Sequence, residues 1–151
     1  MKTNLIAILF LFFLCGCSLP RIYVIDDPLD ARQRNDLGFV YEKQGKLDLA
    51  EKEYKLASRR DRNWAVPLFN LGNVYFKMGD HQKAERQFRK ALRRDPENPD
   101  FMNNLAYVLY KQRKYEEAEK WIDRALSIRQ EEAYLETKKS ILSGKEGEQD
   151  R

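Results

Sequence analysis

Apolar residues recur at helical spacing through the middle of the chain. Leu68, Leu71, Tyr75 and Met78 stand at i, i+3, i+7 and i+10. Residues spaced in this way share one face of an α-helix, so the segment is predicted to be a helix with one buried side. Similar stripes occur upstream and downstream, and together they predict an all-α protein.

The pattern repeats with a period of 34 residues. Each copy has two alanines seven residues apart, at Ala50 and Ala57, Ala84 and Ala91, and Ala118 and Ala125. A large apolar residue follows four positions after the first alanine of each copy, at Tyr54, Phe88 and Ile122. The repeating units are therefore residues 31–64, 65–98 and 99–132. Small residues suit the places where two helices approach closely, and the large residue fills the space between them.

These units resemble the tetratricopeptide repeat, a helix-turn-helix unit of 34 residues. The run from Asn70 through Leu71 and Gly72 to Asp80 is close to the consensus of that family. The resemblance implies a right-handed α-solenoid, in which each first helix lines a concave groove. One unit cannot bury its own apolar face, so three units are expected to stack into one core.

Local signals place the ends of the units. Gly45 and Gly79 recur where the two helices of a unit meet, and Arg113 replaces glycine in the third unit. Asn98 with Pro99, and Asp27 with Pro28, are typical of a capped helix start. Some positions depart from the family pattern and predict weaker edges of the array: Arg34, Arg62 and Gln130.

A seventh helix is expected to cover the last unit over residues 133–142. Its predicted apolar stripe comprises Tyr134, Leu135, Lys138, Ile141 and Leu142. Residues 143–151 contain no apolar side chain and are predicted to form a disordered tail.

The first residues differ in character from the rest. Leu5 to Leu14 form an unbroken apolar run of ten. As a helix this run spans only ~15 Å, about half of a bilayer core, which is typical of a signal peptide. The following Cys15-Gly16-Cys17 resembles the lipobox of bacterial lipoproteins.

The lipobox resemblance implies a signal peptide over residues 1–16 and acylation of Cys17 with chains such as palmitate. Residues 17–30 would then be the lipidated N-terminus and a tether. Ser18 implies the outer membrane, facing the periplasm, if the cell is Gram-negative. Two alternatives remain open: an ordinary signal peptide, and a cytosolic protein with an apolar start.

The family resemblance also implies which residues face a partner. The expected groove residues are Asn35, Phe39, Lys43, Phe69, Asn70, Asn73, Lys77, Asn103, Asn104, Tyr107 and Lys111. Amides such as Asn70 and Asn104 offer both donor and acceptor to a peptide backbone. Phe39, Phe69, Phe76, Tyr107 and Tyr110 are expected to be exposed anchors.

The three groove lysines are interpreted either as a basic column for an acidic segment or as solvated helix surface. Some family members hold a partner's C-terminal carboxylate in a clamp of lysines, asparagines and an arginine. Of the clamp positions only Asn70 matches here, so this mode of recognition is not expected.

The net charge bears on which class of partner the protein binds. Lys and Arg total 28 against 24 for Asp and Glu, a formal charge of +4. This small excess does not favour nucleic acid as a partner. Basic residues of the second helices, such as Arg59 and Arg93, are interspersed with acids and are interpreted mainly as solvated surface.

No catalytic or phosphate-binding motif appears, and His81 is the only histidine. We expect no enzymatic activity, cofactor, metal or small-molecule substrate. The favoured function is a lipid-anchored adaptor that binds an envelope protein or peptide, assisting assembly of a pilus, secretion or outer-membrane complex. The alternatives are a permanent accessory subunit of an envelope complex and a regulator of a cell-wall enzyme.

Overall fold

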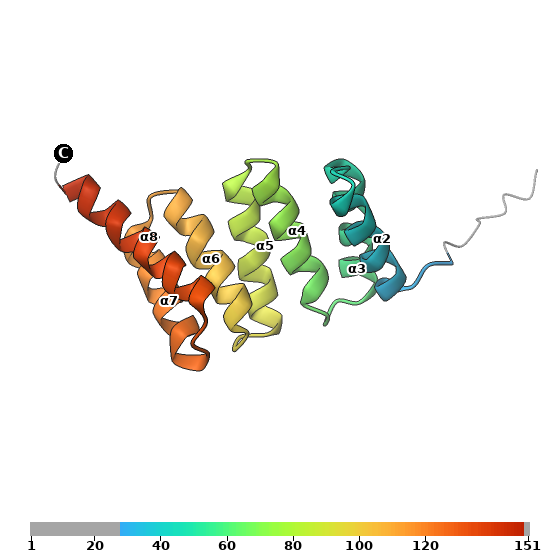
Figure 1. The fold of residues 1–151 in the computed structure, drawn as a ribbon. Helices are drawn as coiled ribbons and strands as arrows, with labels where there is room; N and C mark the ends of the chain where they lie inside the picture. Colours follow the sequence, from blue (N-terminus) through green and yellow to red (C-terminus); the bar gives the residue numbers. More distant parts are fainter. Residues whose placement is uncertain (1–27, 150–151) are drawn as a thin grey trace, which may run out of the picture.

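Seven helices and no strand make up residues 28–149, the part of the chain described by the computed structural model (Figure 1). The helices are α2 (Ala31–Lys43), α3 (Leu47–Arg60), α4 (Val66–Lys77), α5 (His81–Arg94), α6 (Pro99–Lys111), α7 (Tyr115–Ile128) and α8 (Glu132–Gln149). The predicted all-α class is confirmed. The predicted signal peptide, Cys17 and most of the tether lie outside the described residues.

The helices form three hairpins in a row. α2 packs against α3, α4 against α5, and α6 against α7, while each hairpin also contacts the next. Figure 1 shows this order as a row that runs from α2 to α8, where α8 lies against α7. α8 also contacts α6 and so covers the end of the last hairpin. The three-hairpin solenoid with a covering helix is therefore the observed architecture.

Each hairpin holds a small residue of its first helix against a large residue of its second. A Cβ added to Gly72 would lie 2.5 Å from the ring of Phe88. A Cβ at Gly38 would lie 2.8 Å from the ring of Tyr54. The third hairpin has Ala106 and Ile122 at the same two places, and both are fully buried. Larger side chains on second helices are thus matched by smaller ones on first helices.

Side-chain caps define where several helices begin. Asp30 caps α2 and forms a reciprocal capping box with Gln33. Asn98 caps α6 through the backbone N–H groups of Asp100 and Phe101. The helix start expected at Pro28 is therefore wrong. The capping box satisfies the backbone N–H groups of Asp30 and Gln33, and α2 begins at Ala31.

The bends between paired helices use left-handed backbone. Gly45 and Gly79 have φ values of 72° and 80°. Arg113, which replaces glycine in the third hairpin, adopts the same conformation with a φ of 61°. A left-handed conformation costs a residue with a side chain roughly 1–2 kcal/mol. The third bend therefore keeps its shape at a cost that the other two avoid.

An ion pair accounts for one departure from the repeat pattern. Arg34 donates to the carboxylate of Glu53 at 2.5 Å, and the two side chains are only 12% and 8% exposed. Arg34 was expected to weaken the first unit because it replaces an apolar residue. Instead, its charge is paired inside the α2–α3 hairpin.

The last helix is longer than the sequence predicted. α8 continues to Gln149, whereas the prediction was a helix over 133–142 followed by a disordered tail over 143–151. Gly144 lies so close to Tyr110 and Tyr115 that an added Cβ would come within 2.9 Å of both rings. Lys145 pairs with Glu119 of α7 at 2.8 Å. Close packing and this ion pair stabilise the polar final turns.

The buried face of α8 also differs in part from the predicted stripe. Tyr134 and Ile141 are buried as expected, but Leu135 is 45% exposed. Thr137 is buried in its place, and its hydroxyl donates to the carbonyl of Ala133. This intrahelical bond allows a polar residue to face the core.

A carboxylate ties the second hairpin to the third. Glu85 of α5 accepts hydrogen bonds from Arg89 at 2.9 Å, Gln112 at 2.8 Å and Lys114 at 2.7 Å. Burial alone would raise the pKa of Glu85, but the three donors outweigh it and hold the pKa below its ordinary value of 4.5. The ionised carboxylate therefore stabilises the contact between the hairpins.

We expect the Glu85→Gln variant to lose less stability than the unchanged protein when the pH falls below 4.5. A carboxylate with a lowered folded-state pKa stabilises the fold above its ordinary pKa, and this contribution disappears as the pH falls through the folded value. Urea denaturation at a series of pH values measures the effect. Glu116→Gln, at a carboxylate that is 74% exposed, is the control and should leave the acid dependence unchanged. Identical acid dependence in the Glu85 variant would contradict the prediction.

Candidate partner-binding face

The first helices of the hairpins, α2, α4 and α6, carry all the predicted groove residues. We call the surface that these residues form the first-helix face. Its members are Asn35, Phe39 and Lys43 on α2, Phe69, Asn70, Asn73 and Lys77 on α4, and Asn103, Asn104, Tyr107 and Lys111 on α6. Contacts link the three helices along this face: Asn35 to Asn70, and Phe76 to Tyr107.

Some side-chain amides of this face already form hydrogen bonds within the protein. The Asn70 side chain donates to the side-chain oxygen of Asn35 at 2.9 Å, and Asn35 is buried. The Asn104 side chain donates to the backbone carbonyl of Asp100 at 2.8 Å. The side-chain oxygen of Asn103 is buried without a hydrogen-bond partner among the described residues. Of the two asparagines expected to grip a partner, Asn70 therefore also links two hairpins, whereas Asn104 bonds within its own helix.

The aromatic residues differ in how exposed they are. Phe69 stacks on Phe101 at a centroid distance of 4.6 Å and also contacts Phe88. It belongs to the edge of the core, so the expectation that it is an exposed anchor is wrong. Phe39, in contrast, is 51% exposed.

Phe76, Tyr107 and Tyr110 are half-buried like Phe69, so the expectation that they are exposed anchors is wrong for them as well. Phe76 contacts His81 at 5.2 Å and Tyr107 at 5.5 Å, and Tyr107 contacts Tyr110 at 5.9 Å. Each ring buries one side against its neighbour, which fixes its orientation at little cost in rotamer entropy. The stacking of His81 on Phe76 agrees with a structural role for that histidine.

The three lysines do not form a free basic column. Lys77 pairs with Glu42 at 2.6 Å. Lys43 lies over the ring of Phe39 at 5.1 Å, and Lys111 lies over Tyr107 at 5.0 Å. Cation–π contacts of this kind leave the charge accessible while they position it. Of these three lysines, Lys43 and Lys111 therefore offer their charge to a ligand beside an aromatic ring.

Sequence reasoning missed Glu42. Its carboxylate accepts hydrogen bonds from Lys77 and, at 2.8 Å, from the hydroxyl of Tyr54. Burial of Tyr54, with the nearby Glu42 charge, raises the pKa of that hydroxyl well above its usual value. Glu42 stands 34 residues before Phe76, which was expected to line the groove. The repeat register could therefore have placed Glu42 on the groove side of α2.

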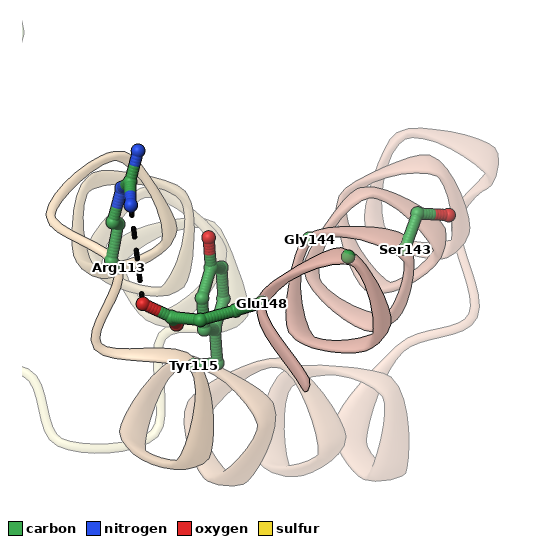
Figure 2. A pocket seen from close by; sticks show the side chains of 6 residues that line it. Arg113, Tyr115, Ser143, Gly144 and Glu148 are labelled. Atoms are coloured by element: carbon green, nitrogen blue, oxygen red, sulfur yellow. Dashed lines mark ion pairs between the residues drawn. The ribbon is translucent and has the colours of Figure 1, made fainter. Parts of the chain in front are cut away.

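A separate hollow lies at the end of the array, between the α6–α7 bend and α8 (Figure 2). Its volume is about 260 Å³, and it is lined by Arg113, Tyr115, Ser143, Gly144, Gly147 and Glu148. Figure 2 shows Arg113 and Glu148 reaching toward each other from the two sides. Their charged atoms are 4.0 Å apart. Both side chains are at least half exposed, so this pair is weak and the hollow is open to solvent.

Within residues 28–149, no group of three or more His, Cys, Asp or Glu side chains is arranged to hold a metal ion. None of the helices in that range is both long and apolar enough to span a bilayer.

Comparisons with known proteins agree with this geometry. Two family models, both described as tetratricopeptide repeat, match residues 31–97 and 69–133. No curated protein matches the sequence.

Solved structures of other proteins share the fold, and two of them are TPR domains. The first TPR of Spaghetti (RPAP3), bound to the HSP90 peptide SRMEEVD, is 23% identical with a TM-score of 0.73; the match covers 78% of this chain and 94% of that one. The Arabidopsis OM64 TPR domain is 19% identical with a TM-score of 0.70, over 74% of this chain and 93% of that one.

Proposed function

This chain belongs, over residues 31–133, to the tetratricopeptide repeat family, and from this premise we propose that it is a lipid-anchored adaptor of the bacterial cell envelope. The fold is typically a non-enzymatic scaffold for protein–protein interaction. In the proposal, the first-helix face binds a partner protein or peptide of the envelope. The adaptor would assist assembly of a pilus, secretion or outer-membrane complex.

The anchor is supported by the sequence before the repeats. The apolar run from Leu5 to Leu14, followed by Gly16 and Cys17, resembles a lipobox. In the proposal, cleavage after Gly16 would leave an acylated Cys17 at the new N-terminus. Each acyl CH₂ contributes about 0.8 kcal/mol of membrane affinity, so two or three chains hold a protein on a membrane durably. Changing Cys17 to serine should move the protein to the soluble fraction, and equal membrane retention would rule out this anchor.

The observation that carries the binding proposal is the pairing of lysines with rings on the first-helix face. Lys43 with Phe39 and Lys111 with Tyr107 each place a charge beside an aromatic surface. Rings with few rotamers supply much of the binding energy at protein interfaces. The peptide bound to Spaghetti supports a polypeptide as the class of ligand.

A clamp for a C-terminal carboxylate is not part of the proposal. Asp100 occupies one of the clamp's cationic positions and already pairs with Arg129 at 2.5 Å. Phe39 and Asn104 also differ from the residues that the clamp requires. We therefore infer recognition of an internal segment of the partner.

Crosslinking in intact membranes, followed by mass spectrometry, tests the proposal. Phe39→Ala and Lys111→Gln should each reduce the yield of the crosslinked partner. Loss of an interface hot spot costs at least about 2 kcal/mol, which corresponds to roughly 30-fold in affinity. Phe39 and Lys111 are exposed, so circular dichroism should show an unchanged helical fold.

Exposed apolar residues favour a second candidate function. Val40 and Leu49 are 47% and 42% exposed on the first hairpin, and Leu135 is 45% exposed on α8. A permanent accessory subunit would bury such residues at the ends of the array. Leu49→Ala and Leu135→Ala are therefore the matched variants. If they lose the crosslinked partner while Phe39→Ala keeps its full yield, the protein is an accessory subunit and not an adaptor.

A further inference from the structure

A basic hollow lies between the carboxyl ends of the second helices α3 and α5, where α4 begins. Its volume is about 440 Å³. The lining residues are Ser58, Arg59, Arg62, Leu68, Lys90, Arg93 and Arg94. Five of these seven residues are cationic and none is acidic. Acidic and basic residues alternate along the sequence, so the sequence does not reveal this cluster of cations. The cluster forms because two hairpins bring their basic residues together.

The charge of the hollow is only partly balanced by the protein. The Arg94 guanidinium donates to the backbone carbonyl of Trp64 at 2.8 Å, which fixes it at the α3–α4 connection. Burial lowers the pKa of Arg94, and the charge of Arg93 lowers it further, while Asp61 opposes both. An arginine remains charged in these surroundings. A bound anion would therefore relieve repulsion between neighbouring cations.

Acidic residues at the same edge of the array have other partners. Asp61 accepts hydrogen bonds from the backbone N–H groups of Asn63 and Trp64. Glu97 pairs with Arg124 at 2.5 Å. These contacts hold the carboxylates in the connections between helices, and none of the carboxylates lines the hollow.

The hollow lies at the edge of the array where the chain enters it. Because paired helices are antiparallel, the start of α2 and the ends of α3 and α5 share one edge, the lower one in Figure 1. Asp30, the cap of α2, follows Cys17 by 30 − 17 = 13 residues. A chain of that length reaches at most ~45 Å. A lipid on Cys17 would thus keep this edge within reach of the membrane surface.

We propose that the basic hollow docks onto the anionic phospholipid headgroups of the membrane that holds the Cys17 lipid. The inference rests on the anchoring part of the proposed function. Arginine forks match the geometry of phosphate oxygens, and an anionic membrane attracts clustered cations near its surface. Docking would turn the lower edge toward the membrane and orient the array relative to the bilayer.

Tryptophan fluorescence tests the docking. The chain has two tryptophans, Trp64 at the α3–α4 connection and Trp121 on α7. The protein is purified from membranes with the Trp121→Phe change and reconstituted in vesicles that carry spin-labelled headgroups. One set of vesicles is phosphatidylcholine alone, and the other contains phosphatidylglycerol. Should Trp121→Phe lose helicity by circular dichroism, the same quenching is measured with both tryptophans present.

Quenching of Trp64 is expected to be stronger in the anionic vesicles and to fall to the neutral level in 1 M salt, where the screening length is about 3 Å. The charge variant Arg59→Gln/Arg62→Gln/Arg93→Gln should lose the same excess quenching. Its matched control removes three exposed lysines elsewhere, Lys52→Gln/Lys120→Gln/Lys139→Gln, and should keep it.

Three results would overturn the docking. The first is equal quenching in both kinds of vesicle, and the second is equal loss in the control variant. The third is a response of Trp64 to a polyglutamate peptide but not to anionic vesicles, which would assign the hollow to an acidic protein segment. The mass of the purified chain reports acylation of Cys17 separately. An unacylated chain would rule out the lipid anchor. If that unacylated chain still bound anionic vesicles and not neutral ones, the docking of the basic hollow would remain supported.

Discussion

Replacement of Phe88 by alanine is expected to lower the free energy of unfolding by about 3–5 kcal/mol, the range typical of phenylalanine truncation in protein cores. Phe88 is 1% exposed and fills the space left by Gly72 on the facing helix. It also contacts Phe69 at 5.7 Å and so links the hairpin to the first-helix face. Urea denaturation followed by far-ultraviolet circular dichroism measures the loss.

Phe39→Ala is the natural control for this prediction. It removes the same side chain from a site that is 51% exposed, and surface substitutions usually change stability by less than about 0.5 kcal/mol. Similar losses in the two variants would mean that the core is not organised around Phe88.

The buried ion pair of the first hairpin gives the second large effect. Arg34→Leu leaves the Glu53 carboxylate buried without its cation, and breaking a pair in this way typically costs about 3–5 kcal/mol. Glu53→Gln should cost less, because the amide oxygen still accepts a hydrogen bond. The double variant reproduces Leu68 and Gln87, the residues at the same places of the second unit.

The double variant is expected to be more stable than the Arg34→Leu variant and close to the unchanged protein. Apolar or neutral replacements of a buried pair are often neutral or stabilising. A double-mutant cycle from urea denaturation gives the coupling between the two sites. Additive losses would show that the pair does not stabilise the α2–α3 hairpin.

The hairpins were predictable because their signals are local. Helical spacing of apolar residues, the alanines of each unit and the glycines at the bends all act within one unit. The length of α8 was not predictable in the same way. Its polar final turns depend on Gly144 meeting two tyrosines and on Lys145 meeting Glu119, contacts between residues far apart in the sequence.

The candidate site was predicted in position but not in detail. All its residues lie on the first helices, as the repeat register requires. Periodicity does not say which side chains bond to each other, so the Asn35–Asn70 and Glu42–Lys77 links between hairpins were missed. The stacking of Phe69 on Phe101 was missed for the same reason, because it depends on the rotamers of both rings.

The matched small and large residues of each hairpin constrain how such a chain evolves. Position 72 has no room for a side chain while Phe88 faces it. In the third unit, Ala106 and Ile122 occupy the same two places. A larger residue at the small position therefore requires a smaller one at the facing position. Gene duplication that copies a whole unit carries both members, so lengthening by complete units preserves the fit that single substitutions disturb.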